Sequence, residues 1–202
     1  MFKLVTLEDT VRIPPEKFGE PTDKVARELL KARYEGIVEE KLGYVIAVMS
    51  VKTNKIGMII AGDGARYHHA SFSLLTFYPQ IQEVVEGEVV EVADFGAFVR
   101  VGPIDALLHV SQIMDDYISY DERQSVMMGK ETRRKLTVGD VVRARITAVS
   151  FAGGGSSGKI GLTMRQPFLG KIEWIKEDVE KLRGGKEKKE VTALTETGVR
   201  HE

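Results

Sequence analysis

Two phenylalanines and a histidine are the residues of this chain best suited to bind a ligand. Phe95 and Phe98 lie in the segment GEVVEVADFGAFVRV, whose valines and alanine are spaced for the inner face of a half-buried strand pair. Gly96 permits a bulge that would bring both rings to the outer face. Exposed, clustered aromatic rings are platforms on which unpaired bases stack, so a binding role is favoured over the alternative, a place in the core.

The motifs around these rings resemble the S1 RNA-binding domain. The pattern Gly87-x-Val89-x-x-Val92-x-x-Phe95-Gly96-Ala97-Phe98-Val99 is followed by Leu108-His109-x-Ser111, Gly139-Asp140-x-Val142 and Lys159-Ile160-Gly161-Leu162-Thr163. The likeness implies a five-stranded antiparallel β-barrel of the OB type over about residues 85–166. It also implies RNA on the face that carries Phe95, Phe98 and His109, with Lys159 on an adjoining strand.

Other basic residues of this region are candidates for phosphate contacts. Arg143 and Arg145 share a face of the strand expected at residues 141–146. Arg165 follows the last barrel strand. An ordinary edge-strand charge is the alternative for Lys159 and for Arg165, and for Arg165 the two interpretations are equal. S1 domains often have an acidic residue and an arginine where this chain has Ser150 and Lys159. Because lysine lacks the planar fork of arginine, the resemblance implies weaker base discrimination there.

Composition limits the class of protein. The chain has 202 residues, 29 basic and 30 acidic, and no cysteine, which excludes disulfides and cysteine-ligated zinc. Residues 82–170 hold 10 basic and 12 acidic side chains. RNA affinity is therefore expected to be modest and to depend on stacking and local cations. No apolar run approaches a membrane span, so we expect a cytoplasmic protein without a membrane segment.

The N-terminal half predicts a small sheet covered by one helix. Alternation predicts a strand over residues 2–13 that ends at Pro14-Pro15. Helical spacing predicts a helix of about five turns from an N-cap at Thr22 to Leu42, before Gly43. Residues 44–51 and 56–61 are expected to form a hairpin, and residues 67–77 another strand. The fold class is therefore α+β.

Taken together, the two halves resemble the archaeal RNA polymerase stalk subunits called E-prime, counterparts of the seventh subunit of eukaryotic RNA polymerase II. The likeness rests on KLVTLEDTVRIPP, the turn Gly62-Asp63-Gly64 and VVEGEVVEVADFGAFVRVGPIDALLHVSQIMDDY, and covers about residues 1–174. It implies an RNP-like tip domain at 1–81 and an S1 domain at 82–170. Residues 171–202 are expected to be a short helix and a disordered charged tail.

This resemblance also implies partners. The family pairs with a smaller stalk subunit, docks its tip on the polymerase core, favours the closed clamp, assists open-complex formation and guides nascent single-stranded RNA. Gly62, Asp63 and Gly64 would insert into the core, because glycine lets backbones approach closely. From the residues alone, the same three are more typical of a turn than of a metal site.

Three further segments carry predictions. The connection over residues 112–137 is long for a barrel and contains Arg133-Arg134-Lys135, which would track phosphates or form a solvated turn. Tyr117 and Tyr120 would either stack on bases or anchor this connection to the barrel, and anchoring is favoured. Gly153, Gly154 and Gly155 are expected in a flexible strand linker. Ile172, Ile175, Val179 and Leu182 predict an amphipathic helix, with Trp174 packed on the barrel.

The sequence carries no signature of catalysis. It has no Gly-x-Ser-x-Gly elbow, Walker A loop, His-Glu-x-x-His motif or cluster of magnesium-binding acids. We expect no intrinsic activity, no cofactor and no metal. Two alternatives stay open: an S1 protein of translation or of an RNA-degrading complex, and a structural adaptor whose barrel has lost RNA binding. The N-terminal domain discriminates against the first, and the aromatic pair against the second.

Overall fold

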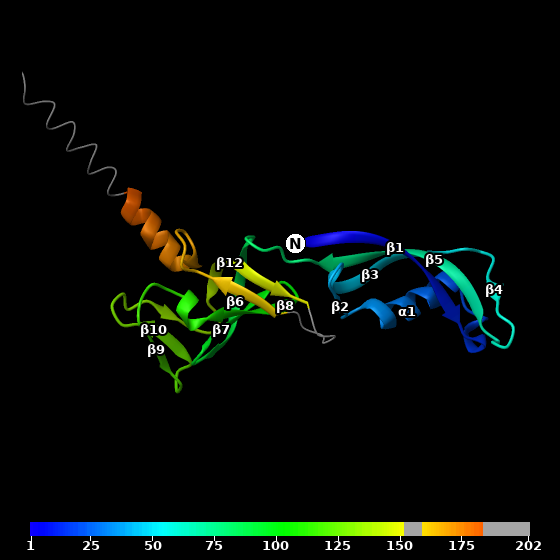
Figure 1. Ribbon diagram of the computed structural model, residues 1–202, viewed down its shortest axis with the longest axis horizontal. Coiled ribbons are helices and arrows are strands. Elements are labelled where there is room, and N and C mark those ends of the chain that lie inside the picture. Colours follow the sequence, from blue (N-terminus) through cyan, green and yellow to red (C-terminus); the bar gives the residue numbers. More distant parts are fainter. Residues whose placement is uncertain (152–158, 184–202) are drawn as a thin grey trace, which may run out of the picture. The chain divides into compact units, whose positions relative to one another are not determined.

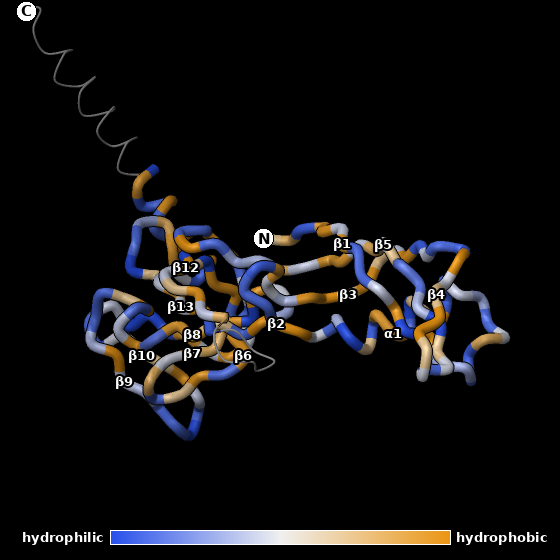
Figure 2. The backbone as a smooth tube through the Cα atoms, turned by 45° about the vertical axis from the view of Figure 1, so that its right-hand side comes forward, coloured by the Kyte–Doolittle hydropathy of each residue, from blue (hydrophilic) through white to orange (hydrophobic). Residues whose placement is uncertain are grey.

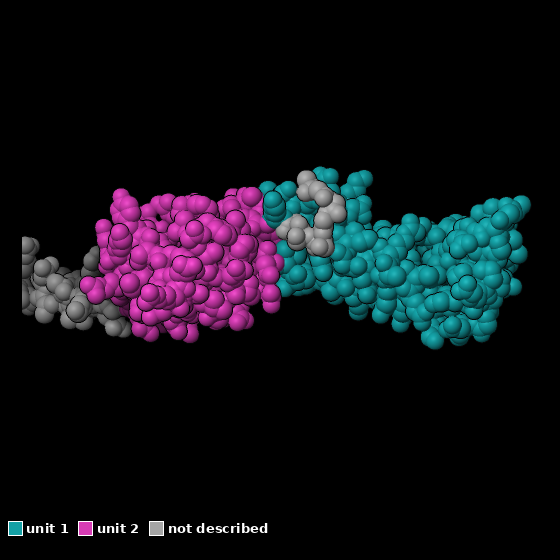
Figure 3. All heavy atoms as spheres, turned by 90° about the horizontal axis from the view of Figure 1, so that it is seen from below, with its two compact units in different colours: residues 1–81, 102–104, 149–159 teal, residues 82–101, 105–148, 160–202 magenta. Residues whose placement is uncertain are grey.

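The computed structural model describes residues 1–151 and 159–183 and divides the chain into two compact units. The first comprises Met1–Ile81, Gly102–Ile104 and Val149–Lys159, and the second Gln82–Val101, Asp105–Ala148 and Ile160–Glu202 (Figure 3). The predicted glycine linker at 153–155 and the charged tail from Lys186 lie outside the described residues. Among the described residues, no helix is long and apolar enough to cross a membrane.

The first unit is a sheet with helix α1 (Thr22–Tyr34) on one face (Figure 1). Its strands are β1 (Phe2–Ile13), β2 (Val38–Glu39), β3 (Gly43–Thr53), β4 (Met58–Ile59) and β5 (Arg66–Phe77), in the order β1-β5-β3-β2 with β4 beside β5. A short 3-10 helix spans Pro15–Lys17. Val25, Ala26 and Leu30 of α1 are fully buried against the sheet residues Val11, Val45, Val48, Phe72 and Leu74. The predicted first strand is confirmed.

The helix is shorter than its apolar spacing predicts. It ends at Tyr34, because Glu35 is extended and Gly36 takes a positive φ of 81°. The chain then turns to pair Val38 with Tyr44, so Ile37, Val38 and Leu42 lie outside the helix. Pro21, not Thr22, occupies the N-cap position, and it makes no side-chain cap hydrogen bond.

The hairpin predicted between residues 44–51 and 56–61 is wrong. Both strands pair with β5: Tyr44 to Thr53 lie along Phe77 to Ala70, whereas β4 pairs only Met58 with Tyr67 and Ile59 with Arg66. The reason is that β5 is 12 residues long and offers ladder positions to both. The short β4 is therefore one side of a protruding loop between β3 and β5.

The second unit is built on a closed five-stranded barrel. Its strands are β6 (Val84–Ala93), β7 (Gly96–Val101), β8 (Ile104–His109), β12 (Val141–Ser150) and β13 (Lys159–Thr163). The order is β13-β8-β7-β6-β12, a β12–β13 pairing closes the ring, and β14 (Gly170–Lys171) adds to β12. The pair β8–β13 is parallel, because a ring with an odd number of strands cannot alternate direction throughout. The predicted OB-type barrel is otherwise confirmed.

The long connection after β8 is folded rather than open. A 3-10 helix spans Val110–Gln112, and β9 (Ile118–Asp121), β10 (Val126–Gly129) and β11 (Lys135–Leu136) form a small sheet in the order β11-β10-β9. Residues 172–183 are helical. Trp174 is only 7% exposed, and Arg134 lies over its ring at 5.5 Å and pairs with Asp178 at 2.5 Å. The predicted helix and the burial of Trp174 are confirmed.

Candidate nucleic-acid interface

Phe95 and Phe98 form an accessible edge-to-face pair on the second unit. Their ring centroids are 6.0 Å apart and the ring planes meet at 82°. Phe95 is 47% exposed and Phe98 is half-buried, whereas the neighbouring Ala97 and Val99 point into the barrel. The predicted bulge at Gly96 is wrong, because Phe95 lies in the turn before β7 and the register shift is on β6 between Val89 and Glu91. The turn itself frees Phe95 from the strand's alternation.

Gly96 holds this turn against the end of β8. A Cβ at Gly96 would lie 2.3 Å from the carbonyl oxygen of Leu108 and 3.0 Å from the Cα of His109, so no other residue fits without movement. The backbone N–H of Val110 donates to the carbonyl of Phe95 at 2.9 Å. Phe95 and His109 are therefore neighbours, although 14 positions separate them in the sequence.

His109 is exposed, and its ring orientation is fixed by Ser111. The backbone N–H of Ser111 donates to Nδ1 at 3.2 Å, and the Ser111 hydroxyl lies 2.8 Å from the same atom. Because Nδ1 accepts, the neutral ring carries its proton on Nε2. Within the described residues that N–H has no partner, so it can donate to a phosphate or a base edge, and the exposed ring can stack.

Arg165 lies on the same side of the barrel. Its Nη1 donates to the carbonyl of Ser111 at 3.4 Å, its backbone N–H to Thr163 Oγ1 at 3.3 Å, and its Nη2 pairs with Asp115. The Asp115 side chain is 86% exposed. A pair this exposed contributes little to stability, so the guanidinium can exchange Asp115 for a phosphate at small cost.

The structure does not bring the other predicted basic residues to this place. Lys159 lies two residues before Gly161, which pairs with Leu107, so it is level with Asp105 and about 13 Å along the strand from His109. Arg143 pairs with Glu86 on β6, five positions from the Glu91 that opposes Phe98. RNA contacts by these residues stay predictions.

Arg145 alternates with Arg143 on β12, opposite Val84. Its Nε is buried and has no hydrogen-bond partner within the described residues.

Four candidates, Phe95, Phe98, His109 and Arg165, form one surface, which we call the aromatic face. The sequence named both Arg165 and Lys159 as candidates, and the structure places Arg165 on this face and Lys159 apart from it.

The two tyrosines of the long connection differ. Tyr120 donates its hydroxyl to the carbonyl of Val92 at 3.2 Å, which confirms the expected anchor. Tyr117 is 77% exposed, and the expectation that it anchors the connection is wrong. The backbone there is held by Lys130 N–H on the Tyr117 carbonyl and by Thr132 N–H on the Asp116 carboxylate. Arg134 of the basic cluster is engaged by Asp178 and Trp174.

The turn Gly62-Asp63-Gly64 is organised around the Asp63 carboxylate. Arg12 donates to it from Nε and Nη2, both at 2.7 Å, the Tyr67 hydroxyl donates at 2.6 Å and the Ala65 N–H at 3.2 Å. These donors, Arg12 foremost, hold the pKa of the Asp63 carboxyl well below its usual range. Asp63 therefore shapes the loop. Its oxygens are occupied, which argues against a metal site.

Four apolar side chains on this loop project into solvent. The exposed fractions are 87% for Ile56, 54% for Met58, 73% for Ile59 and 52% for Ile60. We call these residues the apolar tip; Figure 2 colours β4 and its surroundings by hydropathy. The sequence analysis placed them in the second strand of a hairpin, although the run KIGMII, apolar at nearly every position, could have signalled a contact surface.

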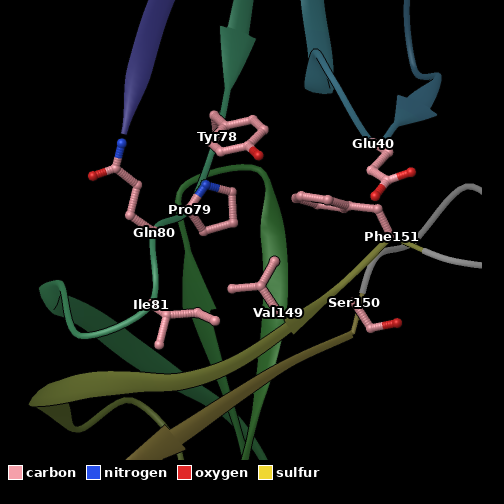
Figure 4. Close-up of a pocket in the computed structure, with 8 residues that line it drawn as sticks. All are labelled: Glu40, Tyr78, Pro79, Gln80, Ile81, Val149, Ser150 and Phe151. Carbon is pink, nitrogen blue, oxygen red and sulfur yellow. The ribbon is translucent and has the colours of Figure 1, made fainter.

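A hollow in the first unit is lined partly by apolar side chains. It has a volume of about 550 Å³ and is lined by Glu40, Tyr78, Pro79, Gln80, Ile81, Val149, Ser150 and Phe151 (Figure 4). The rings of Tyr78 and Phe151 lie 5.9 Å apart, and Lys3 Nζ lies 4.3 Å from the Tyr78 ring. On β1, Phe2 and Leu4 are 59% and 66% exposed. The first unit thus has accessible apolar surface beyond its tip.

The chain is similar to known polymerase subunits along most of its length. A model described as "SHS2 domain found in N terminus of Rpb7p/Rpc25p/MJ0397" matches residues 8–64, and one described as "S1 RNA binding domain" matches residues 78–160. DNA-directed RNA polymerase subunit Rpo7 of Saccharolobus shibatae is 45% identical over 175 residues, 87% of this chain and 97% of the relative.

Two further relatives extend this comparison. Rpo7 of Sulfolobus acidocaldarius is 42% identical over 181 residues, 90% of this chain and 98% of the relative. DNA-directed RNA polymerase III subunit RPC8 of Bos taurus is 27% identical over 157 residues, 75% of this chain and 77% of the relative.

Proposed function

Because the chain belongs to the family of the Rpo7 subunit of DNA-directed RNA polymerase, we propose that it is a non-catalytic stalk subunit that binds nascent single-stranded RNA. It pairs with a smaller stalk subunit, docks on the polymerase core through its apolar tip, and aids clamp closure and open-complex formation. Among these roles, RNA binding has the most direct structural support.

The observation that carries RNA binding is the aromatic face. Phe95 at 47% exposure and the exposed His109 ring present flat surfaces next to a guanidinium that is lightly engaged by Asp115. Bases stack on such rings with a contribution of about 1–3 kcal/mol each, and Arg165 supplies a phosphate contact. A purely structural adaptor would gain nothing from keeping a phenylalanine half in water.

The test is a titration of single-stranded RNA against the full chain and its variants. Phe98→Ala and His109→Ala should each weaken binding by about 1–3 kcal/mol. Phe2→Ala, at a 59% exposed phenylalanine on β1, is the control and should bind like the wild type. If all three variants bind like the wild type, the aromatic face does not bind RNA.

Docking on the core is proposed for the apolar tip and its supporting turn. The side chains of Ile56 and Ile59 are 87% and 73% exposed. Their exposure to water is energetically unfavourable, and insertion into an apolar pocket would relieve it. The turn Gly62-Asp63-Gly64 supports the tip without inserting itself, because Asp63 fixes the loop through hydrogen bonds from Arg12 and Tyr67. Gly62 has a φ of 90°, which a side chain would strain.

A charge placed at the tip tests this assignment. Ile59→Glu should abolish co-purification with the polymerase core without changing the thermal unfolding midpoint. Met49→Glu, at a 53% exposed position on β3, is the control and should still assemble. Retention of Ile59→Glu on the core would exclude the tip as the docking element. In a reconstituted polymerase, a variant that docks less on the core should also form fewer open promoter complexes.

The smaller partner is proposed to cover exposed apolar surface on β1. Phe2 and Leu4 point to the same side of β1, because strand side chains alternate, and both are more than half exposed. Leu4→Glu should prevent heterodimer formation, as measured by sedimentation, while the variant remains folded. An unchanged dimerisation constant would place the partner elsewhere.

A further inference from the structure

The exposed ring of Tyr117 stands beside the aromatic face at the edge of a hollow of about 330 Å³. We propose that this hollow is a separate subsite for one base of the single-stranded RNA, stacked on Tyr117, and that it favours bases with an exocyclic amino group. The inference rests on the proposed RNA-binding function and extends it to a position outside the barrel.

Continuity with the aromatic face supports the assignment. Ser111 and Arg165 line the hollow together with Tyr117. Ser111 also holds the His109 ring through Nδ1, and Arg165 Nη1 donates to the Ser111 carbonyl at 3.4 Å. A strand of RNA that leaves His109 along Arg165 therefore meets Tyr117 next.

The backbone beneath Tyr117 is held independently of the ring. The Tyr117 carbonyl accepts from Lys130 N–H at 2.9 Å. The neighbouring Asp116 carboxylate accepts from the N–H of Glu131 at 3.1 Å and from the N–H and hydroxyl of Thr132, both at 2.9 Å. Because this backbone is already fixed, a base that stacks on Tyr117 has to order only the side chain. Tyr120, whose hydroxyl is bound by Val92, shows what a structural tyrosine of this connection looks like.

Arg165 at the edge of the hollow is assigned to a phosphate, whereas the carboxylates of the lining favour a base over a phosphate beside Tyr117. Asp115 is engaged by Arg165 and Asp116 by the loop, whereas the Glu131 side chain makes no hydrogen bond or ion pair within the described part of the chain. A carboxylate repels phosphate but accepts hydrogen bonds from the amino groups of cytosine, adenine and guanine. Uracil has no exocyclic amino group and offers the carboxylate only its ring N3–H, which lies between two carbonyl oxygens that a carboxylate repels. The hollow should therefore discriminate against uracil.

Oligonucleotide length separates this subsite from the aromatic face. The full chain and its variants are titrated with trimers and decamers of cytidine and of uridine. Tyr117→Ala should weaken binding of the cytidine decamer roughly 5- to 100-fold and leave the trimer unchanged. Tyr117→Phe keeps the ring and should bind like the wild type. Met128→Ala, a 39% exposed residue of β10, is the control for the same small sheet.

Base preference supplies the second readout. Glu131→Gln should narrow the wild-type preference for the cytidine decamer over the uridine decamer, because an amide can donate to uracil as well as accept. If Tyr117→Ala binds decamers like the wild type while Phe98→Ala does not, the subsite is wrong and the proposed function stands. If neither variant changes binding, both are wrong. Equal wild-type affinity for the two decamers would overturn the amino-group preference.

Discussion

Replacing Gly96 with alanine tests the geometry of the aromatic face without altering any side chain that would touch RNA. The added Cβ would lie 2.3 Å from the Leu108 carbonyl oxygen and 3.1 Å from its carbonyl carbon. Real Cβ atoms do not approach backbone oxygens so closely, so the turn must move away from β8 by about 1 Å. The hydrogen bond from Val110 N–H to the Phe95 carbonyl spans that gap and should break or lengthen.

The expected cost follows from these contacts. Overpacking against backbone costs about 1–3 kcal/mol, and the lost backbone hydrogen bond adds about 1 kcal/mol. A loss of this size lowers the unfolding midpoint by roughly 4–8 °C per kcal/mol for a unit of this length. Because Phe95 moves away from His109, single-stranded RNA binding should fall by about tenfold or more, a loss of one stacked base.

Gly161→Ala is the matched control. Gly161 lies in the adjoining strand β13, and its Cβ would meet Thr147 Oγ1 at 3.3 Å and Ala148 Cβ at 3.5 Å, which are contacts that small shifts relieve. Thermal unfolding and an RNA titration on both variants complete the assay. Equal midpoints and equal affinities for Gly96→Ala and Gly161→Ala would refute the claim that close backbone approach builds this face.

Three further predictions concern the supporting contacts. Arg12 lowers the pKa of Asp63. The contribution of this pair to stability is therefore fully present above the ordinary carboxyl pKa of about 3.9, and it is lost as the pH falls through the depressed value. An NMR titration in which the Asp63 carboxyl has an ordinary midpoint would contradict this. Arg12→Gln should return that midpoint towards about 3.9 and raise amide exchange across residues 60–65, whereas unchanged exchange would show that the tip turn does not depend on Arg12. Arg134→Ala should cost about 1 kcal/mol and shift the fluorescence of the single tryptophan to longer wavelength, because Trp174 loses its covering cation; an unchanged spectrum would mean that the helix over 172–183 packs without it.

The strands were predictable because their signal is local. Alternation along residues 2–13 and 67–77 reports one buried face per strand, and the structure places strands at Phe2–Ile13 and Arg66–Phe77. The helix was overextended because Ile37, Val38 and Leu42 continue its apolar spacing. The helix ends because Gly36 takes a positive φ and Val38 pairs with Tyr44 on β3. The apolar spacing encodes neither feature.

The candidate site was predictable only in part. Phe95, Phe98 and His109 follow from motif spacing, but their meeting depends on Gly96 packing against Leu108, which spacing does not encode. Lys159 is the first residue of β13, and Arg165 follows the end of that strand. Only the register of β13 on β8 shows that Arg165 is near His109 while Lys159 is not. The apolar tip was misassigned because a run of apolar residues predicts a strand but does not show whether its side chains are exposed.

Photo-crosslinking of single-stranded RNA to the full chain, with the crosslinked peptides mapped by mass spectrometry, tests the central claim most directly. The account predicts crosslinks at Phe95, Phe98 and His109. Crosslinks confined to Arg143 and Arg145 on β12, with none between residues 94 and 111, would contradict it.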